Sequence, residues 1–314
     1  MASTRLYSCT IDMEAVYGTG DGGPTAIALT NDCVPEIDKE DINLPVYTSS
    51  LGRPTSYVAF KKWNLPIKGF IKGMAGFSSG LTGWELGKMF RSFGLQQSGS
   101  TGVSQTFKVR DAGHESVTYT VNDNGIQYQV TGARGDELKL IFKAGRPGEY
   151  EGNVRGRYNA PTAVAYSVPT LDDSAMIPQN VVSMALTMNG VAHALPEITI
   201  TIKNIGEYIE DINSANDGIK EYVITGREFT FEGTAIRDDS NDVEWWSHLT
   251  TPTIIAVAST GYGTAGGNKI DIDFANFQFS DLKRTQYKGE AAYGFKGFIN
   301  QHVTAATEFQ IKLT

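Results

Sequence analysis

Apolar and polar residues alternate in several short stretches of the chain, and this alternation predicts strands. The stretches are Glu197–Lys203, Ile126–Val130, Lys269–Phe274 and Glu308–Leu313. Because successive side chains of a strand point to opposite faces, each stretch would bury one face and leave the other in water. Turn-forming sequences at Asn122–Gly125 and Gly261–Gly267 separate strands, as hairpins require. The chain is therefore expected to be mainly β.

Two stretches show helical spacing instead. Thr82–Glu85 has the form of a capping box, and apolar residues follow it at helical spacing from Leu86 to Phe93. Asn241–Glu244 precedes a shorter apolar series that must end before Pro252. The sequence predicts one short helix after each of these two starts.

Short blocks of sequence recur in the same order in the two halves of the chain. The tripeptide Pro-Glu-Ile begins at Pro35 and again at Pro196, and a glycine closes a strand-like run 38 residues later in the first half and 37 residues later in the second. Trp84 and Trp245 follow those glycines. The strongest match is two glycines and an asparagine at identical spacing, namely Gly148, Gly156 and Asn159 and then Gly289, Gly297 and Asn300.

This order predicts two tandem copies of one domain, at residues 1–165 and 166–314, because recurring blocks mark an architecture of similar units. A chain of 314 residues suits two domains of about 150 residues each. The other interpretation is that a glycine-rich β protein produces such matches by chance. Under the duplication, both halves should have one topology, with the six matching residues superposed.

Charge and composition narrow the class of protein. The net charge is −8, which argues against a protein that grips phosphate backbones, since such proteins carry a basic stripe. The longest apolar runs, such as Ile254–Ala258, are far shorter than the ~20 residues that cross a bilayer, and no signal-peptide core follows Met1. Cys9 and Cys33 are expected to be buried apolar residues without a disulfide or metal. The protein is expected to stay soluble in a cytoplasm.

Three motifs match catalytic or cofactor patterns without the required context. Gly76–Gly80 fits a nucleophile elbow around Ser78, but no alternating β-α pattern surrounds it and the four histidines offer no partner motif. Gly18–Gly23 and Gly261–Gly266 fit a dinucleotide pattern, but neither opens a helix. We expect loops at all three sites, no cofactor and no enzymatic activity.

Two acidic groups also have plain structural interpretations. Asp238, Asp239 and Asp242 would need convergent placement to hold calcium, and they are interpreted as a polar loop that runs into the first turn of a helix. Asp271 and Asp273 share one face of a strand and are interpreted as part of a solvated sheet face. No metal site is expected.

In the first half, the predicted helix is followed by strands that contain Gly132–Gly135, Leu138–Gly145, Gly148-Glu149 and Val154–Tyr158. The second half has similar segments at Tyr222–Gly233, Trp245–Thr250 and Phe277–Phe298. In this order the two halves resemble the major tail tube proteins of long-tailed bacteriophages, over roughly residues 25–165 and 180–314.

The resemblance implies a β-sandwich or barrel-like domain with one flanking helix in each half. It implies that the extended sheet of each subunit joins its neighbours into a ring with a wide, β-lined lumen, and that stacked rings form a tube for DNA. The usual subunit has one such domain. A duplicated chain is therefore expected to close a ring with three chains and a pseudo-sixfold appearance, and the alternative is a six-chain ring with the second domain outside.

The partners that the resemblance implies are further copies of the chain and the tape measure, tail terminator and tail tip proteins. DNA would pass through the lumen without specific binding, and no membrane would be contacted. The protein would be assembled in the host cytoplasm and reside in the virion. The runner-up function is a carbohydrate- or receptor-binding β-sandwich of the tail tip, which would present exposed aromatic residues, whereas the tryptophans here fall mostly in predicted strands or helices.

A lumen through which DNA slides is expected to be poor in lysine and arginine, because each basic side chain adds a phosphate contact. On the strand Ile126–Val130 the apolar residues would face the core and leave Gln127 and Gln129 on the other side. The same alternation on a later strand leaves Asp271 and Asp273. These four residues are the predicted lumen residues, although the alternation fits an outer solvated surface equally well.

Overall fold

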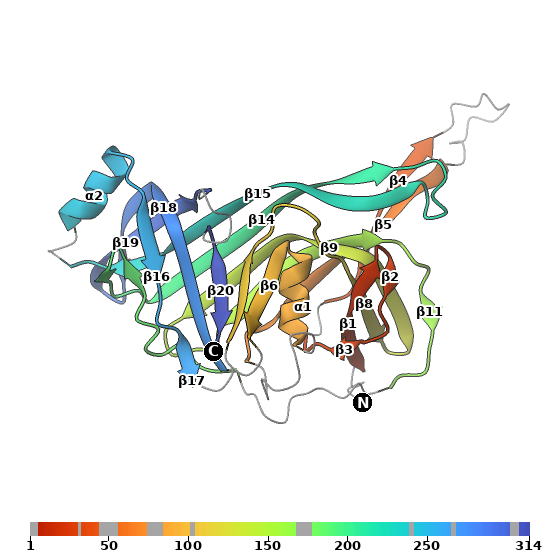
Figure 1. Ribbon diagram of the computed structural model, residues 1–314, viewed down its shortest axis with the longest axis horizontal. Helices are drawn as coiled ribbons and strands as arrows, with labels where there is room; N and C mark the ends of the chain where they lie inside the picture. Colours follow the sequence, from red (N-terminus) through yellow and green to blue (C-terminus); the bar gives the residue numbers. More distant parts are fainter. Residues whose placement is uncertain are drawn as a thin grey trace.

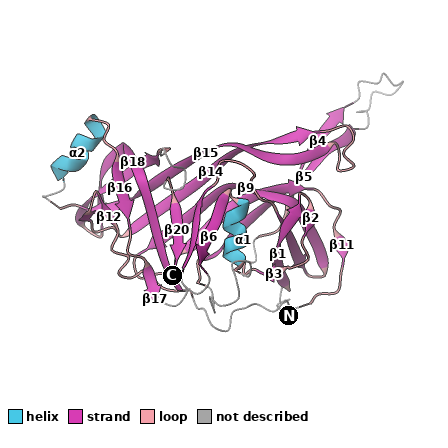
Figure 2. Cartoon of the chain, in the orientation of Figure 1, coloured by secondary structure: helices cyan, strands magenta, loops and turns pink. Residues whose placement is uncertain are grey.

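The computed structural model describes residues 6–30, 33–43, 56–73, 84–100, 104–167, 178–238, 242–264, 268–301 and 308–314. Within these residues the chain forms 20 strands and two helices, and strand is by far the commoner state (Figure 2). The prediction of a mainly β fold with a short helix in each half is confirmed. The described strands form an extended sheet that does not close into a barrel (Figure 1).

The first half contains eleven of the described strands. They are β1 (Tyr7–Val16), β2 (Thr19–Gly20), β3 (Thr25–Ala26), β4 (Glu36–Asn43), β5 (Ser56–Phe70), β6 (Leu95–Ser100), β7 (Ser104–Val109), β8 (Val117–Asp123), β9 (Ile126–Lys143), β10 (Glu149–Arg157) and β11 (Thr162–Ala163). The predicted strand at Ile126–Val130 is the first part of β9, and the predicted turn at Asn122–Gly125 joins β8 to β9.

The second half contains the other nine. They are β12 (Thr187–Met188), β13 (Val191–Ala192), β14 (Glu197–Glu210), β15 (Ile219–Ile236), β16 (Ile255–Ala258), β17 (Tyr262–Thr264), β18 (Asn268–Tyr287), β19 (Glu290–Ile299) and β20 (Gln310–Leu313). The three strands predicted here are confirmed within β14, β18 and β20. Gly261–Gly267 separates the strands β16 and β18, as predicted, but its first part is not a turn, because Tyr262 is buried and pairs with Ile270 as part of β17. Residues 265–267 lie outside the described residues.

Both predicted helices are present. They are α1 (Glu85–Ser92) and α2 (Asp242–Thr250). α1 begins directly after Trp84, which makes no side-chain capping hydrogen bond, and Thr82 of the predicted capping box lies outside the described residues. The apolar face of α1 is buried, as its spacing predicts, and Phe90 is 1% exposed. In α2, the ring of Trp245 packs 5.3 Å from that of Phe279 on β18.

Eight strands form one continuous antiparallel series across both halves, which we call the long sheet (Figure 1). Its hydrogen-bonded order is β4-β5-β10-β9-β14-β15-β19-β18. Each half contributes four strands in the same order, namely a hairpin, a later strand, and the strand that precedes it in the chain. The two sets meet where β9 pairs with β14, from Lys143 opposite Glu197 to Glu137 opposite Lys203. We call this junction the β9–β14 seam.

A second layer covers one face of the long sheet. The first part of β9 leaves the long sheet and pairs with β8, which pairs with β1. The first part of β18 pairs with β20, and β20 pairs with β7 of the first half. In Figure 1, α1 lies between these two groups of strands. The last strand of the chain therefore ties the second half to the first.

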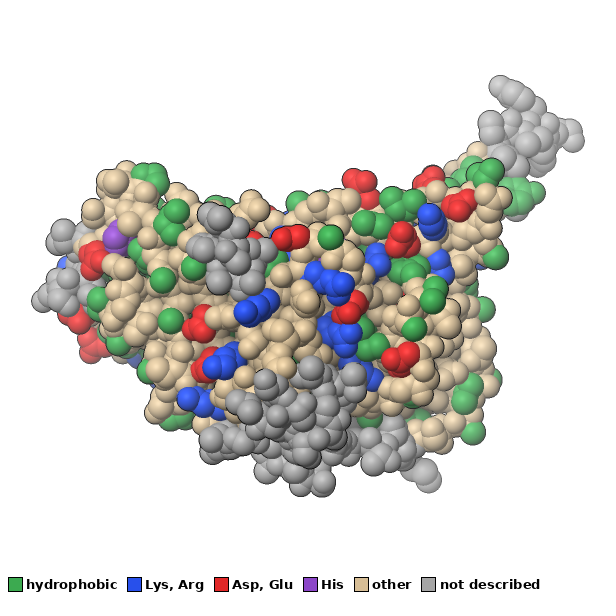
Figure 3. All heavy atoms as spheres, in the orientation of Figure 1, with side chains coloured by type: hydrophobic (Ala, Val, Ile, Leu, Met, Phe, Trp, Pro, Cys, Tyr) green, Lys and Arg blue, Asp and Glu red, His purple; other side chains and the backbone are tan. Residues whose placement is uncertain are grey.

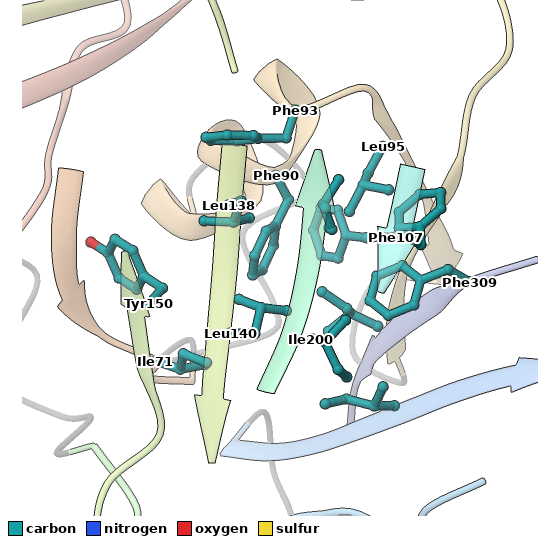
Figure 4. Packing of buried hydrophobic residues seen from close by; sticks show 14 of the residues in the cluster. Ile71, Phe90, Phe93, Leu95, Phe107, Leu138, Leu140, Tyr150, Ile200 and Phe309 are labelled. Carbon is teal, nitrogen blue, oxygen red and sulfur yellow. The ribbon is translucent and has the colours of Figure 1, made fainter. Parts of the chain in front are cut away.

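Side chains between the layers form one hydrophobic cluster with members from both halves. Leu138 and Leu140 of β9 and Ile200 of β14 lie on the same side of the seam as Phe90 and Phe107 (Figure 4), and all five are at most 1% exposed. The core thus lies directly under the seam, and the two halves share it. The division into 1–165 and 166–314 stays a prediction, and residues 168–177, close to that boundary, lie outside the described ranges.

Candidate functional site

The other face of the long sheet is polar, and we call it the uncovered face. One row of directly opposite residues crosses it from β5 to β18: Lys68, Glu151, Lys139, Thr201, Thr230, Phe298 and Gln278. All seven are half-buried or exposed. Alternation produces this face, because the intervening residues of the same strands, such as Leu138 and Ile200, fill the core.

Lysines on the uncovered face are paired with carboxylates. The distances from Nζ to the carboxylate oxygen are 3.7 Å for Lys68–Glu151, 3.0 Å for Lys139–Glu137, 3.1 Å for Lys143–Glu197 and 3.7 Å for Lys296–Glu232. The hydrogen bond to Glu137 raises the pKa of Lys139. Such exposed pairs contribute little to stability. Their consequence is electrostatic, because each of these lysines has a negative neighbour.

The long sheet ends in two strands whose outer edges have no strand partner among the described residues. β4 pairs with β5 on one side, and the part of β18 after Phe277 pairs with β19 on one side. Every residue of β4 is exposed. The two edges lie at opposite ends of the molecule (Figure 1). An open edge presents unpaired N–H and C=O groups, which are a template for pairing with another strand.

The matching glycines lie at corresponding points of the two four-strand sets. Gly156 is opposite Trp63 of β5, and a Cβ there would lie 2.8 Å from the carbonyl oxygen of Thr131. Gly297 lies between β15 and β18, and a Cβ there would overlap the carbonyl oxygen of Gln278. In both places the neighbouring backbone leaves no room for a side chain.

The other matching residues flank the same strands. Gly148 directly precedes β10, and Gly289, at φ +91°, directly precedes β19. The Asn159 amide donates to the carbonyl oxygen of Gln129 at 3.0 Å, and the Asn300 amide donates to the Gln278 side chain at 2.9 Å. Both asparagines thus tie the end of a hairpin to its longer strand. Superposition of the two halves stays a prediction.

Gln127 and Gln129 lie on the first part of β9, away from the uncovered face. They line a hollow of about 670 Å³ together with Asn216 from the turn between β14 and β15. The prediction that the apolar side chains of this strand face the core is correct for Val130, which is buried. It is wrong for Ile126, which is 45% exposed because it starts the strand at the margin of the core.

Asp271 and Asp273 lie on the first part of β18, beside β20. Asp273 accepts hydrogen bonds from the Ser259 backbone N–H at 3.2 Å and from the Gln310 amide at 3.3 Å. Both aspartates are half-buried, and burial raises the pKa of Asp271. The two predicted lumen pairs therefore belong to different parts of the second layer, and their place in a lumen stays a prediction.

The motif matches gain no catalytic context within the described part of the chain. Ser78 lies outside it. Gly18–Gly23 forms a hairpin turn in which the Gly18 N–H donates to Glu14, and the described part of Gly261–Gly266 contains the strand β17, so neither opens a helix among the residues that the structure describes. No group of three or more His, Cys, Asp or Glu residues among those described is placed to hold a metal. Cys9 and Cys33 are both buried, as expected.

A polar hollow of about 570 Å³ lies beside β15 and the start of β20, lined by His114, Arg227 and Glu308 among others. Burial, and then the charge of Arg227, lowers the pKa of His114. Burial raises the pKa of Glu308. The His114 ring nitrogen is 2.9 Å from the carbonyl oxygen of Arg110 and 3.0 Å from the Arg227 guanidinium. These contacts join β15 to the loop before β8. We therefore interpret these polar residues as structural.

Three of the four tryptophans are in the core. Trp63, Trp84 and Trp245 are at most 4% exposed, and Trp246 is half-buried with its indole N–H 3.4 Å from the hydroxyl of Tyr293. They therefore do not form the exposed aromatic cluster that a carbohydrate-binding face would present. On the face shown in Figure 3, acidic and basic side chains are interspersed without a basic stripe.

The uncovered face is not predicted from the sequence, although the signal for it exists. Glu197–Lys203 alternates charged or threonine residues with isoleucines, and Leu138–Lys143 alternates lysines with large apolar residues except at Ile141. That pattern gives each strand a polar side but not its partner. Only the pairing of β9 with β14 brings the polar sides together.

None of the described helices is long and apolar enough to span a membrane. The chain matches no protein-family model, and no curated protein sequence is significantly similar to it.

Proposed function

We propose that this chain is a structural subunit that assembles into rings, and that the stacked rings form the tail tube of a long-tailed bacteriophage. The β9–β14 seam carries the proposal, because it joins the last strand of one four-strand set to the first strand of the next. The chain contains this junction once and leaves the corresponding strands open at its two ends, β18 and β4.

Repeating the junction between chains gives a head-to-tail interface, and such an interface generates a ring when its rotation closes. With eight long-sheet strands per chain, three chains supply about 24 strands, and at ~4.8 Å between strands the ring has a diameter of roughly 37 Å before strand tilt widens it. Six four-strand sets around such a ring give the pseudo-sixfold appearance. A ring of this width accommodates duplex DNA.

The uncovered face would line the channel, because the second layer on the other face would fill the lumen if it pointed inward. Its lysines have carboxylate neighbours, and threonines occupy the centre of its main row. A surface of this kind offers few unpaired cations to phosphates, so DNA can slide without being held. The proposal therefore has two candidate channel surfaces. One is the uncovered face, and the other is the part of the second layer that contains Gln127, Gln129, Asp271 and Asp273. Lysine substitutions on each surface, followed by measurement of DNA binding, distinguish the two.

Further copies of the chain are the primary partners in this proposal. The rings at the two ends of a tube expose surfaces that neighbouring tail proteins would cover, namely the tape measure inside and the terminator and tip proteins at the ends. The proposed location is the virion, and DNA is cargo and not a bound ligand.

Electron microscopy of the purified protein at increasing concentration tests this function. The expected result is rings or tubes with six similar lobes, and native mass spectrometry of single rings should give three chains. Six chains per ring would contradict the pseudo-sixfold arrangement. A protein that remains monomeric at high concentration, with and without salt, would overturn the proposal of a tube subunit.

A further inference from the structure

The β9–β14 seam supplies a template for the contact between neighbouring chains. We infer that the outer edge of β4 pairs antiparallel with the C-terminal part of β18 from a second copy of this chain, in the register that the seam displays. The inference rests on the proposed ring assembly. It adds the two strands that meet, their relative direction and the residues that lie opposite each other.

The two hairpins that end in β10 and β19 identify equivalent positions on β9 and β18. In the first half Glu149 lies opposite Ile141, and in the second half Glu290 lies opposite Tyr287. Glu149 and Glu290 follow the matching glycines at the starts of β10 and β19. Tyr287 is therefore the counterpart of Ile141.

The hairpins β4–β5 and β14–β15 extend the comparison to β4 and β14. The matching Gly156 and Gly297 lie opposite Trp63 and Phe231, which in turn lie opposite Ile37 and Ile200. Ile37 is therefore the counterpart of Ile200, and Glu36 is the counterpart of Thr199. In the seam Thr199 lies opposite Ile141. Substituting counterparts along the seam gives the pairs between chains, which are Glu36 with Tyr287, Asp38 with Thr285, Lys39 with Arg284 and Glu40 with Lys283.

The two edges carry opposite charges. β4 has four carboxylates and one lysine, which is a net charge of −3. Residues 282–288 carry two lysines and one arginine with no carboxylate, which is a net charge of +3. In the derived register Glu40 faces Lys283 directly and Asp38 lies diagonally opposite Lys283, while Lys39 with Arg284 is the one like-charged pair. Opposite charges at these positions stabilise cross-strand pairing.

Burial is consistent with an interface that the single chain leaves open. Ile37 and Ile42 on β4 are 46% and 40% exposed, and residues 283–286 of β18 are all exposed. Their counterparts inside the seam include Leu138 and Leu140, which are fully buried. Polar residues at the open edge keep an unassembled chain from non-specific pairing, so the contact can form after the chain has folded.

Disulfide trapping tests the register. Two single variants, Asp38→Cys and Thr285→Cys, are mixed, allowed to assemble and oxidised, and the dimer is scored by non-reducing electrophoresis. Both positions are exposed, and the native Cys9 and Cys33 are buried. The matched control replaces Thr285→Cys by Gln286→Cys, whose side chain points to the other face. The expected result is at least tenfold more dimer from the 38–285 mixture than from the 38–286 mixture.

Charge reversal tests the edges independently. Glu40→Lys and Lys283→Glu should each weaken one lateral contact about fivefold, and the double variant should recover most of the loss. Far-ultraviolet circular dichroism and the Tm of each variant establish that the chain still folds. Rescue by the double variant is expected only if the two residues meet.

The outcomes separate this inference from the proposed function. If rings form but the 38–286 mixture or neither mixture is trapped, and the double variant is not rescued, the β4–β18 register is wrong while ring assembly stands. If neither the wild type nor any variant assembles, both are overturned, and the charges on β4 and β18 serve only to protect open edges.

Discussion

Among single residues, the matching glycines show how closely the long sheet is packed. Gly297 lies between two strands at a point where even a methyl group would meet the backbone oxygen of Gln278 and the ring of Phe277. Gly226, also on the long sheet, has room for a methyl group, because a Cβ there would lie 3.6 Å from the Ile205 side chain, which is an ordinary van der Waals contact. The methyl group of an alanine is therefore expected to displace neighbouring atoms at Gly297 but not at Gly226.

Gly297→Ala is expected to lower the free energy of unfolding by about 2 kcal/mol, because an added methyl group in a close-packed site displaces its neighbours. Gly226→Ala is the control and should change it by less than about 0.5 kcal/mol, or stabilise slightly. The measurement is the urea midpoint of each variant. Equal midpoints for the two variants would show that the backbone around Gly297 moves aside at little cost.

Among the elements, the β14–β15 hairpin extends beyond the seam as an arm that lies over the N-terminal strands (Figure 1). The hydroxyl of Tyr17 accepts a hydrogen bond from the backbone N–H of Tyr222 at 2.8 Å. Arg134 and Arg157 lie over the ring of Tyr17, at 4.9 and 4.5 Å from its centroid. Arg157 also donates to the carbonyl oxygen of Lys220. This cluster fixes the direction of the arm.

Tyr17→Phe keeps both cation–π contacts and removes the acceptor of the Tyr222 N–H. A backbone donor left without a partner costs about 1–3 kcal/mol. We expect stability to fall by that amount and hydrogen exchange at Tyr222 to accelerate. Tyr57→Phe, at a 63% exposed position on β5, is the control and should change neither. Unchanged exchange at Tyr222 in the Tyr17 variant would mean that the arm is held by other contacts.

In the molecule as a whole, the long sheet and the second layer share one core but present different surfaces to the solvent. The second layer carries both predicted lumen pairs, and the long sheet carries the uncovered face with its paired charges. Which surface meets DNA depends on which layer points inward when chains join. Charge placed on each surface therefore distinguishes the two arrangements.

Thr201→Lys with Thr230→Lys would add two unpaired cations per chain to the centre of the uncovered face. Tubes of this variant should retain duplex DNA more tightly, with a steeper loss of binding as salt rises, because each new phosphate contact releases counterions. Co-sedimentation of tubes with DNA at several salt concentrations measures this. Asp271→Lys with Asp273→Lys is the matched variant and should have no effect. The reverse result would move the channel to Asp271 and Asp273.

Alternation and helical spacing were enough to predict the mainly β fold, because the period of apolar residues depends only on local geometry. The strands around Ile200 and Ile272 and both helices follow from it. It failed at Tyr262, where pairing with β18 makes a strand from a glycine-rich segment, and at Ile126, which lies at the margin of the core. Both failures depend on neighbours that are distant in sequence.

The order of matching blocks likewise predicted two sets of strands, and the structure gives both sets the same hydrogen-bonded order. What local sequence could not specify is that Lys139 lies opposite Thr201 on the other half of the chain, or that β20 pairs with β7. A strand pattern gives each strand a polar and an apolar side, but its partner is chosen by how all strands together bury the shared core. The uncovered face and the two open edges exist only as a result of that choice.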